Sequence, residues 1–392
     1  MYHVRATRSN GVGARLDATR FKLLIENGKI EWRDRQPKLW ILASRHSGDN
    51  TQLMAIAGAL GWPTEIKRLF YRWHEELVRI AGLASLSAVD ASRSSPIGPP
   101  WPDVILSAGR STEAVARWIK RHGNPAAKIV FVGTPWASPE CFDLVITTPQ
   151  YGLPQAHNIL HLPLPVHSVT PERLAEEGQR WAGRLTHLPE RRIAVLVGGA
   201  SGPYTFSRDA AIRLASAANR MANERNAALL VTTSARTPAT AASALENAIT
   251  APACIFHYAP DAPDNPFFAF LDLADEVIVT ADSISMLAEA SATGKPVWLF
   301  DIEDGQQSMR AEEGHDPLPP IGWRGKSLET TAFRALMRLT PPRWSRDLRV
   351  VHRGATKQGL AQWLGEEPLS RATPAQQNLE AAAARIRGLF GL

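Results

Sequence analysis

Cysteine is nearly absent from this sequence. Cys141 and Cys254 are the only two among 392 residues, and no Cys-x-x-Cys pair occurs. Two thiols cannot build a disulfide framework, and each stands in an apolar, strand-like run, which favours a buried and unreactive thiol. The sequence therefore predicts a protein of a reducing compartment such as the cytoplasm.

Long hydrophobic runs are missing too. No stretch of about 18 or more apolar residues occurs, so no membrane-spanning helix is predicted. Residues 1–36 are polar and basic and lack the apolar core of a secretory signal, so we expect them to form an N-terminal extension. These absences favour a cytoplasmic protein and leave open a peripheral contact with the inner face of an inner membrane.

Metal-binding motifs are also lacking. The 11 histidines are scattered without a His-Glu-x-x-His pattern, and the Asp-x-Asp motif of one large class of nucleotide-sugar enzymes is absent. Gly-x-Ser-x-Gly is absent as well, which argues against an α/β-hydrolase. We therefore expect no metal and no bound cofactor.

The charge that is present is mildly basic. Lys and Arg number 44 against 38 Asp and Glu, a net charge of +6, which suits nucleic acid, an anionic membrane or phosphorylated ligands. Zinc patterns, RNP-like motifs and Lys-rich stretches are lacking, so we do not expect nucleic acid as a partner. Many of the 12 tryptophans stand among Arg and Lys in the first part of the chain, either as core residues or, if exposed, as contacts for an anionic membrane. These are Trp32, Trp40, Trp62, Trp73, Trp101, Trp118 and Trp136.

Strand and helix patterns alternate along the chain in two series. Each strand is a short apolar run followed by small polar residues, which is typical of a parallel sheet covered on both faces. A chain of 392 residues with this pattern predicts an α/β fold with two Rossmann-like, doubly wound parallel-sheet domains that face a cleft. The expected strands are 39–44, 64–68, 104–107, 128–132 and 144–147 in the first series, and 193–197, 228–232, 254–258, 277–280 and 297–300 in the second.

The segment Asp275–Ile302 points most directly to a function. It reads as a buried strand, a polar turn, a helix and a second buried strand. Ser283 and Ser285 fall where the helix begins, so their hydroxyls and the unpaired backbone N–H groups form an anion site. Glu289 lies one turn further on the same face. Donors for a diphosphate and a carboxylate for ribose hydroxyls suit a nucleotide, and the plainer alternative is a capped helix of an ordinary α/β domain.

Two further loops of the second series place polar groups at strand ends. Gly198, Gly199 and Ser201 form a loop that lets the backbone approach a phosphate, although it is neither Gly-x-Gly-x-x-Gly nor a Walker A motif. Thr233 and Arg236 follow the next strand and would hold a diphosphate leaving group. Tight turns and helix caps explain the same residues without a ligand.

In the first series the loop at 44–50 is dense in reactive side chains. His46 or Asp49 would remove a proton from a sugar hydroxyl, with Gly48 and Asn50 beside them. The alternative is that Asp49 or Asn50 caps a helix over 51–60.

Polar and aromatic residues after two later strands extend this acceptor side. Arg110 and Ser111 form a second polar loop at a strand end, in which Arg110 would bind an acidic acceptor. Trp136 would stack on a sugar face or else pack in the core.

Four of these segments together resemble one family. They are Ser44–Gln52, Pro102–Thr112, Ile193–Gly199 and Thr280–Phe300, and they look like the bacterial relatives of the plant elongated-mitochondria fission factor. The resemblance covers roughly residues 38–302 and implies a two-domain nucleotide-sugar glycosyltransferase of the GT-B type. Bacterial members are regarded as glycosyltransferases of the lipopolysaccharide outer core, whereas the plant member is a mitochondrial-surface adaptor for a dynamin-like protein. By position, the resemblance assigns Ser283, Ser285 and Glu289 to the donor segment, Gly198, Gly199 and Ser201 to its glycine loop, and Gly48 and Asp49 to the N-terminal cleft loop.

We therefore expect a basic extension at 1–36, an acceptor-side domain at 37–180, a nucleotide-sugar-binding domain at 190–330 and a helical tail at 331–392 that returns to the first domain. The expected activity is the metal-independent transfer of a sugar from a nucleotide-sugar donor to a glycan or glycolipid acceptor. Two alternatives stay open: a nucleotide-sugar epimerase on the same fold, which needs no acceptor, and a non-enzymatic membrane or dynamin-type adaptor.

Overall fold

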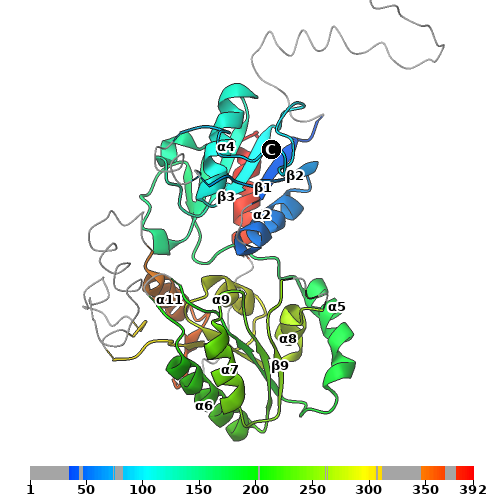
Figure 1. Ribbon diagram of the computed structural model, residues 1–392, viewed down its shortest axis with the longest axis vertical. Helices are drawn as coiled ribbons and strands as arrows, with labels where there is room; N and C mark the ends of the chain where they lie inside the picture. Colours follow the sequence, from blue (N-terminus) through cyan, green and yellow to red (C-terminus); the bar gives the residue numbers. More distant parts are fainter. Residues whose placement is uncertain are drawn as a thin grey trace, which may run out of the picture.

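Two lobes, each built on a six-stranded parallel sheet, stand one above the other in Figure 1. The expected fold of two doubly wound α/β domains is therefore confirmed. The computed structural model describes residues 35–43, 47–73, 75, 83–201, 204–260, 262, 264–305, 308–310, 346–366 and 377–392. Most of the expected basic extension and His46 lie outside these residues.

In the first sheet the spatial order of the strands departs from their order in the chain. The order is β2-β1-β3-β4-β5-β6, and every neighbouring pair is parallel. Most of its strands are buried apolar runs, as a sheet covered on both faces requires. The strands are β1 (Leu39–Ala43), β2 (Thr64–Arg68), β3 (Val104–Ala108), β4 (Lys128–Val132), β5 (Leu144–Thr147) and β6 (Ile159–His161).

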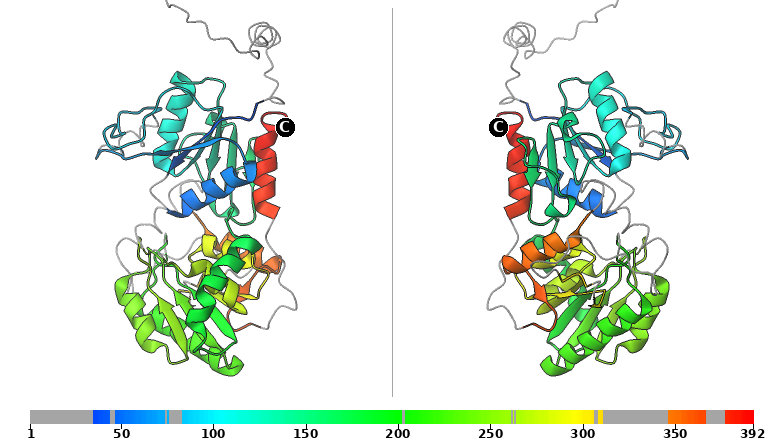
Figure 2. Two further views of the ribbon diagram at one scale, coloured as in Figure 1. Left: turned by 90° about the vertical axis from the view of Figure 1, so that its right-hand side faces the viewer. Right: turned by 90° about the vertical axis from the view of Figure 1, so that its left-hand side faces the viewer.

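Helices cover both faces of the first sheet. Alternate residues of β1 belong to two separate hydrophobic cores, one shared with α2 (Ser47–Leu60) and α12 (Gln377–Gly388), the other with α4 (Arg110–His122). Figure 2 shows α12 (red) beside α2 (blue), although these helices stand near opposite ends of the chain. The last helix thus completes the core of the first lobe.

The second sheet has the order β12-β11-β10-β7-β8-β9, again with every neighbouring pair parallel. Its strands are β7 (Arg192–Leu196), β8 (Ala228–Thr232), β9 (Ala253–Phe256), β10 (Glu276–Thr280), β11 (Val297–Phe300) and β12 (Gln362–Trp363). Its helices are α5 (Pro171–Ala182), α6 (Arg208–Arg225), α7 (Ala239–Ala248), α8 (Phe267–Leu273), α9 (Ile284–Ser291) and α11 (Leu348–Lys357).

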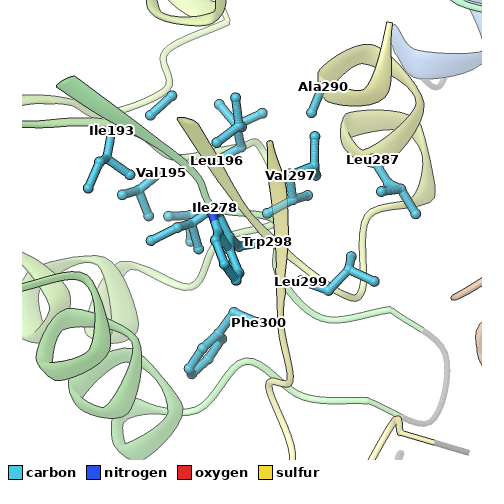
Figure 3. Packing of buried hydrophobic residues seen from close by; sticks show 14 of the residues in the cluster. Ile193, Val195, Leu196, Ile278, Leu287, Ala290, Val297, Trp298, Leu299 and Phe300 are labelled. Atoms are coloured by element: carbon cyan, nitrogen blue, oxygen red, sulfur yellow. The ribbon is translucent and has the colours of Figure 1, made fainter. Parts of the chain in front are cut away.

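The period of two along β11 explains how this lobe is layered. In Figure 3, Val297 and Leu299 point to the side of α9, and Trp298 and Phe300 point to the other side. Arg225 and Arg213 of α6 lie over the rings of Trp298 and Phe300. A strand buried on both faces needs apolar residues at every position, which is why it reads as a continuous hydrophobic run.

Each sheet contains one point where the direction of strand addition reverses. This switch point lies between β1 and β3 in the first sheet and between β7 and β10 in the second. The connections that leave such a pair of strands run to opposite faces and leave a crevice at their carboxyl ends, where ligands of open α/β sheets bind. Most of the loops predicted as sites from the sequence start at these four strands.

The described part of the expected tail divides between the two lobes. Residues 346–366 form α11 and β12 and pack in the core of the second lobe, whereas α12 packs in the first. In the part of the chain that the structure describes, no helix combines the length and the apolar character needed to cross a bilayer.

Candidate functional site between the lobes

The first turn of α2 lies at the switch point of the first sheet. The helix begins at Ser47, earlier than the expected residue 51, so Gly48, Asp49 and Asn50 lie inside its first turn and not in a preceding loop. A carboxylate is favoured there because the N-terminal end of a helix carries partial positive charge.

The start of α4 forms the other side of this crevice. Gly109 has a φ of 78°, which favours glycine, and no side chain caps the helix there. The guanidinium of Arg110 lies 5.0 Å from the centroid of the Trp136 ring. Ser111 donates a hydrogen bond to the buried carboxylate of Glu75. The structure therefore brings Arg110, Ser111 and Trp136 together, as the acceptor-side prediction requires.

A buried carboxylate holds the Trp136 loop in place. Glu113, in the first turn of α4, accepts hydrogen bonds from the backbone N–H groups of Trp136 at 2.7 Å and Ala137 at 2.9 Å. Burial raises the pKa of Glu113, and the two N–H donors and Arg117 oppose that rise. Glu113 thus positions the aromatic ring over which Arg110 lies.

Tyr151 is a site residue that the sequence did not predict. It ends the short helix η3 (Pro149–Tyr151), which follows β5. Burial raises the pKa of its hydroxyl, and the Asp49 carboxylate adds to that rise. The charges of Arg346 and Arg110 and a hydrogen bond from Arg346 oppose it. Because Coulomb interactions fall with distance, these side chains from four segments lie near one another.

Gly198 and Gly199 lie at the switch point of the second sheet. The N–H of Gly198 donates to Oγ1 of Thr280 at 2.7 Å, and the N–H of Gly199 donates to Oδ2 of Asp282 at 2.8 Å. A Cβ on Gly199 would lie 2.0 Å from the carbonyl oxygen of Arg236, a distance no real Cβ adopts. The two glycines therefore permit close backbone packing, and their amides, expected to face a phosphate, bond within the protein.

Asp282 is the charged residue at the centre of this packing. It is only 2% exposed, and its Oδ2 also lies 3.2 Å from Nη2 of Arg236. Burial raises the pKa of Asp282, and Arg236 and the Gly199 amide oppose the rise. Its Oδ1 is buried and has no hydrogen-bond partner among the described residues. A buried polar oxygen without a hydrogen-bond partner lowers the stability of the folded protein.

The start of α9 supplies open hydrogen-bond donors next to Asp282. The helix begins after Ser283, and no side chain caps it. The hydroxyls of Ser283 and Ser285 make no hydrogen bond to the described residues. By contrast, α5, α6 and α11 are each capped by a side chain of Thr170, Ser207 and Asp347, respectively. The first amides of α9 therefore remain open donors.

Arg236 and Arg346 flank the glycine loop with two positive charges. Nη1 of Arg236 donates to the carbonyl oxygen of Ala200 at 3.1 Å, and Nη2 of Arg346 donates to Oγ of Ser201 at 2.6 Å. Thr233, which the sequence grouped with Arg236, instead accepts a hydrogen bond from a backbone amide through its hydroxyl. The two guanidinium groups bind the consecutive residues Ala200 and Ser201, and a pair of cations so placed suits the charge of a diphosphate.

Glu289 lies one turn into α9 and is half-buried. Burial raises its pKa from 4.5 to about 8, and Arg173 is the one charge that opposes the rise. Its carboxyl group makes no hydrogen bond or ion pair to any described residue. A carboxyl group that is desolvated and unpaired is typical of a position that a ligand completes.

Residues Arg346 and Asp347 connect the two lobes. Arg346 binds Ser201 of the second lobe and lies against Tyr151 of the first, and the N–H of Asp347 donates to the carbonyl oxygen of Gln150 at 2.8 Å. In Figure 2 the helix that follows, α11 (orange), lies on the side of the second lobe that faces the first.

His352 fixes the turn before Asp282. It is buried, and burial lowers its pKa from 6.5 to about 4, so the ring is neutral at neutral pH. Its Nε2 lies 2.6 Å from the carbonyl oxygen of Ala281, so Nε2 carries the hydrogen and donates it. A residue of the tail thereby positions the switch point of the second sheet.

The sequence missed Tyr151, Asp282, Arg346 and His352 for different reasons. Asp282 lies in the predicted polar turn, just after a buried strand, and that position is the sequence signal that could have identified it as a candidate site residue. The other three come from segments that no local pattern connects to a strand end, so only the fold shows their proximity.

No group of three or more His, Cys, Asp or Glu residues arranged to hold a metal ion occurs among the described residues. A surface hollow of about 530 Å³ lies instead at the amino ends of β1 and β2, lined by Arg35, Gln36, Lys38, Pro63, Thr64 and Glu65. It is at the opposite edge of the sheet from the switch point, so it is separate from the site described above.

Comparison with known proteins identifies the family. The family model described as "Mitochondrial fission ELM1" matches residues 47–324, most of the chain. The chain belongs to the mitochondrial fission ELM1 family. The resemblance seen in the four sequence segments is thereby confirmed.

Two curated relatives extend this result. The chain is 24% identical over 297 residues to "Uncharacterized protein RP120" of Rickettsia prowazekii, covering 67% of this chain and 82% of that protein. It is also 24% identical over 263 residues to mitochondrial fission protein ELM1 of Arabidopsis thaliana, covering 59% of each. The chain thus spans less than two thirds of the plant protein.

Solved structures show more distant likeness. UDP-GlcNAc 2-epimerase from Neisseria meningitidis bound to UDP-GlcNAc has a TM-score of 0.43 and 10% identity, covering 90% of this chain and 92% of that one. The ADP-heptose heptosyltransferase II of E. coli has a TM-score of 0.37 and 12% identity, covering 67% of this chain and 84% of that one. At these scores the likeness assigns no activity to this chain.

Proposed function

We propose that this protein is a glycosyltransferase that moves a sugar from a nucleotide-sugar donor to a glycan or glycolipid acceptor. The observation that carries the proposal is the link between the two switch points: Arg346 donates a hydrogen bond to Ser201 of the second lobe and lies beside Tyr151 of the first. Tyr151 and Arg346, with the neighbouring Ser201, link the first-lobe crevice to the second-lobe crevice. A two-substrate transfer needs a donor and an acceptor held face to face, and two linked switch points would supply such an arrangement.

The second lobe would bind the donor. The open amides of α9 and the hydroxyls of Ser283 and Ser285 would bind the diphosphate, together with Arg236 and Arg346. Glu289 would accept hydrogen bonds from the ribose hydroxyls. Fixed N–H dipoles and guanidinium groups would also stabilise the negative charge that develops on the departing nucleotide, and the transfer would need no metal.

The first lobe would bind the acceptor. Asp49 would act as the general base, because it stands at the switch point beside Tyr151 and Arg110. His46, the other candidate for this role, lies outside the described residues. Arg110 and Arg346 would favour an acceptor with a negative charge, and an acceptor carried on a lipid would place the enzyme at the inner face of a bacterial membrane.

A thermal-shift panel tests the donor site. UDP, GDP, CMP, dTDP and ADP sugars are added separately, and one nucleotide class should raise the melting temperature because it binds only the folded protein. Glu289→Gln should weaken that shift. The exposed Glu176, on the outer surface of α5, provides the matched control as Glu176→Gln.

Transfer is then measured with the donor that binds. Asp49→Ala should reduce turnover by about 100-fold or more and leave nucleotide affinity nearly unchanged, and EDTA should have no effect on the wild-type rate. Conversion of the donor without acceptor would identify an epimerase instead. Absence of binding to every nucleotide would leave the adaptor as the better hypothesis.

A further inference from the structure

One exposed strip of the first lobe alternates apolar and basic side chains. It begins within β2, the edge strand of the first sheet, and continues into the residues after it. Lys67 and Leu69 are buried, whereas Ile66, Arg68, Phe70 and Arg72 are exposed, as the period of two in an extended chain dictates, and Trp73 at the end of the strip is exposed as well. We name the exposed residues the edge strip: Ile66, Arg68, Phe70, Arg72, Trp73 and Arg93.

The apolar members of the edge strip are unusually open to solvent. Ile66 is 44% exposed, Phe70 is 41% exposed and Trp73 is 88% exposed. Contact of such an exposed apolar ring with an apolar phase is favourable, because it removes apolar surface from water. Exposed Trp near a phosphate-rich surface is typical of the interface region of a bilayer, which accepts both the apolar ring and the indole N–H.

The edge strip carries a net positive charge. The guanidinium of Arg93 lies 4.7 Å from the centroid of the Phe70 ring. Arg68 and Arg72, two residues before and two residues after Phe70, are exposed to solvent. Asp90 is the carboxylate close to Arg72 and Arg93. Among the described residues of this surface, the three guanidinium groups of the edge strip stand against the Asp90 carboxylate, a balance that complements an anionic surface.

Protection of an open sheet edge does not explain these residues. The backbone that continues β2 is already paired: the carbonyl oxygens of Arg68 and Phe70 accept from the N–H groups of Ser95 and Asp90, each at 2.8 Å. The N–H of Arg72 donates to the carbonyl oxygen of Ala88 at 2.8 Å. A covered edge needs no charged side chains to prevent pairing with another chain, and edge protection never needs an exposed Trp.

The edge strip leads directly to the candidate acceptor site. Trp73 stands two residues before Glu75, which corresponds to at most about 7 Å between their Cα atoms. The carboxylate of Glu75 accepts a hydrogen bond from Ser111 at the start of α4. A surface that bound the edge strip would therefore lie near the acceptor-side crevice.

We infer that the edge strip docks on an anionic lipid bilayer and that the acceptor is presented from that bilayer. The bilayer contact stands on the edge strip itself, whereas the nature of the acceptor rests on the proposed function. Trp73 and Phe70 insert among the acyl chains near the headgroups, and the Arg side chains bind lipid phosphates. A lipid-borne acceptor then enters the first-lobe crevice without leaving the membrane.

Sedimentation with lipid vesicles tests this inference. The full-length protein should bind phosphatidylcholine vesicles that contain phosphatidylglycerol, bind pure phosphatidylcholine much more weakly, and dissociate as salt is added. Trp73→Ala should weaken binding roughly tenfold through lost apolar contact. Arg72→Gln should weaken it about fivefold.

Exposed residues of the second lobe provide matched controls. Ile212 is 39% exposed and Arg220 is exposed, both on α6, so Ile212→Ala and Arg220→Gln should bind vesicles like the wild type. Equal binding of Trp73→Ala and Ile212→Ala would overturn the inference, as would the absence of any binding to anionic vesicles. Binding of single-stranded RNA that Trp73→Ala abolishes, with vesicle binding unchanged, would assign the strip to nucleic acid.

The thermal-shift panel separates this inference from the proposed function. Trp73→Ala should leave the nucleotide-induced shift unchanged, because the strip belongs to the first lobe and the proposed donor residues Ser283, Ser285 and Glu289 belong to the second. Vesicle binding without any nucleotide binding would keep the bilayer contact and reject the transfer.

Discussion

Glu289 is a carboxyl group at a position where a negative charge is unfavourable. Burial raises its pKa from 4.5 to about 8, so the folded protein holds it largely protonated at neutral pH. The unfolded chain releases this proton at lower pH. The stability that the protonated form contributes is therefore complete below pH 4.5 and is lost as the pH rises through about 8.

Glu289→Gln should remove this pH dependence. Near pH 5 the variant and the wild type should have nearly equal free energies of unfolding, and near pH 8 the variant should be more stable by about 1–3 kcal/mol, a value reduced because the side chain is only half-buried. Denaturant unfolding at both pH values measures the difference. Glu176→Gln should show no such pH-dependent gain, and a gain of equal size in both variants would contradict the assignment.

At the scale of secondary-structure elements, the loop after β7 and the turn after β10 are packed backbone to side chain. Thr280, Asp282 and Thr237 all bond the Gly198–Gly199 segment. The segment is therefore held rigidly, and it positions Ala200 and Ser201 for Arg236 and Arg346. Rigid support of this kind is what a binding loop requires.

Gly199→Ala should disturb this packing. Its Cβ would lie 2.0 Å from a backbone carbonyl oxygen, which cannot move without shifting the next loop. We expect a loss of about 2–4 kcal/mol in the free energy of unfolding and a loss of the nucleotide-induced thermal shift.

Gly58→Ala is the matched control for that substitution. A Cβ at Gly58 meets no atom within 4 Å, and the residue lies inside α2, so alanine should stabilise the protein by about 0.5–1 kcal/mol. Equal changes in the free energy of unfolding for the two substitutions would show that the close contact between residue 199 and Arg236 does not affect stability.

At the scale of the whole molecule, the C-terminal part of the chain joins the lobes. Residues 346–366 complete the second sheet, and α12 completes the core of the first lobe. Arg346 lies between the lobes and bonds Ser201 in one and Tyr151 in the other. The relative position of the two switch points therefore depends on a segment remote from both in sequence.

Arg346→Ala should loosen this connection. We expect faster hydrogen exchange at the amides of residues 150–151 and 199–201. Nucleotide-sugar affinity should fall by roughly 10- to 100-fold, because a charge-assisted hydrogen bond contributes about 1.5–3 kcal/mol. Arg353→Ala, an exposed site on α11, should change neither measurement. Unchanged exchange in Arg346→Ala would contradict a role between the lobes.

The strands and helices of this fold follow from local sequence patterns. Continuous apolar runs such as Val104–Ala108 form buried parallel strands here, because a sheet covered on both faces has no polar side. The small and polar residues that follow the strands likewise predict that Arg110, Ser283 and Glu289 lie near strand ends. The predicted roles of these residues in binding and catalysis remain predictions.

Which residues meet at those strand ends depends on the packing of the whole chain. Asp282 became the centre of the second-lobe crevice because the strand order puts β7 beside β10, and no local pattern encodes that order. Tyr151 and Arg346 meet, and His352 binds Ala281, because chain segments far apart in sequence pack together. Periodicity in the sequence indicates which face of a helix or strand is buried. Which other helix or strand packs against that face depends on long-range packing. The connection between the lobes is therefore visible only in the folded chain.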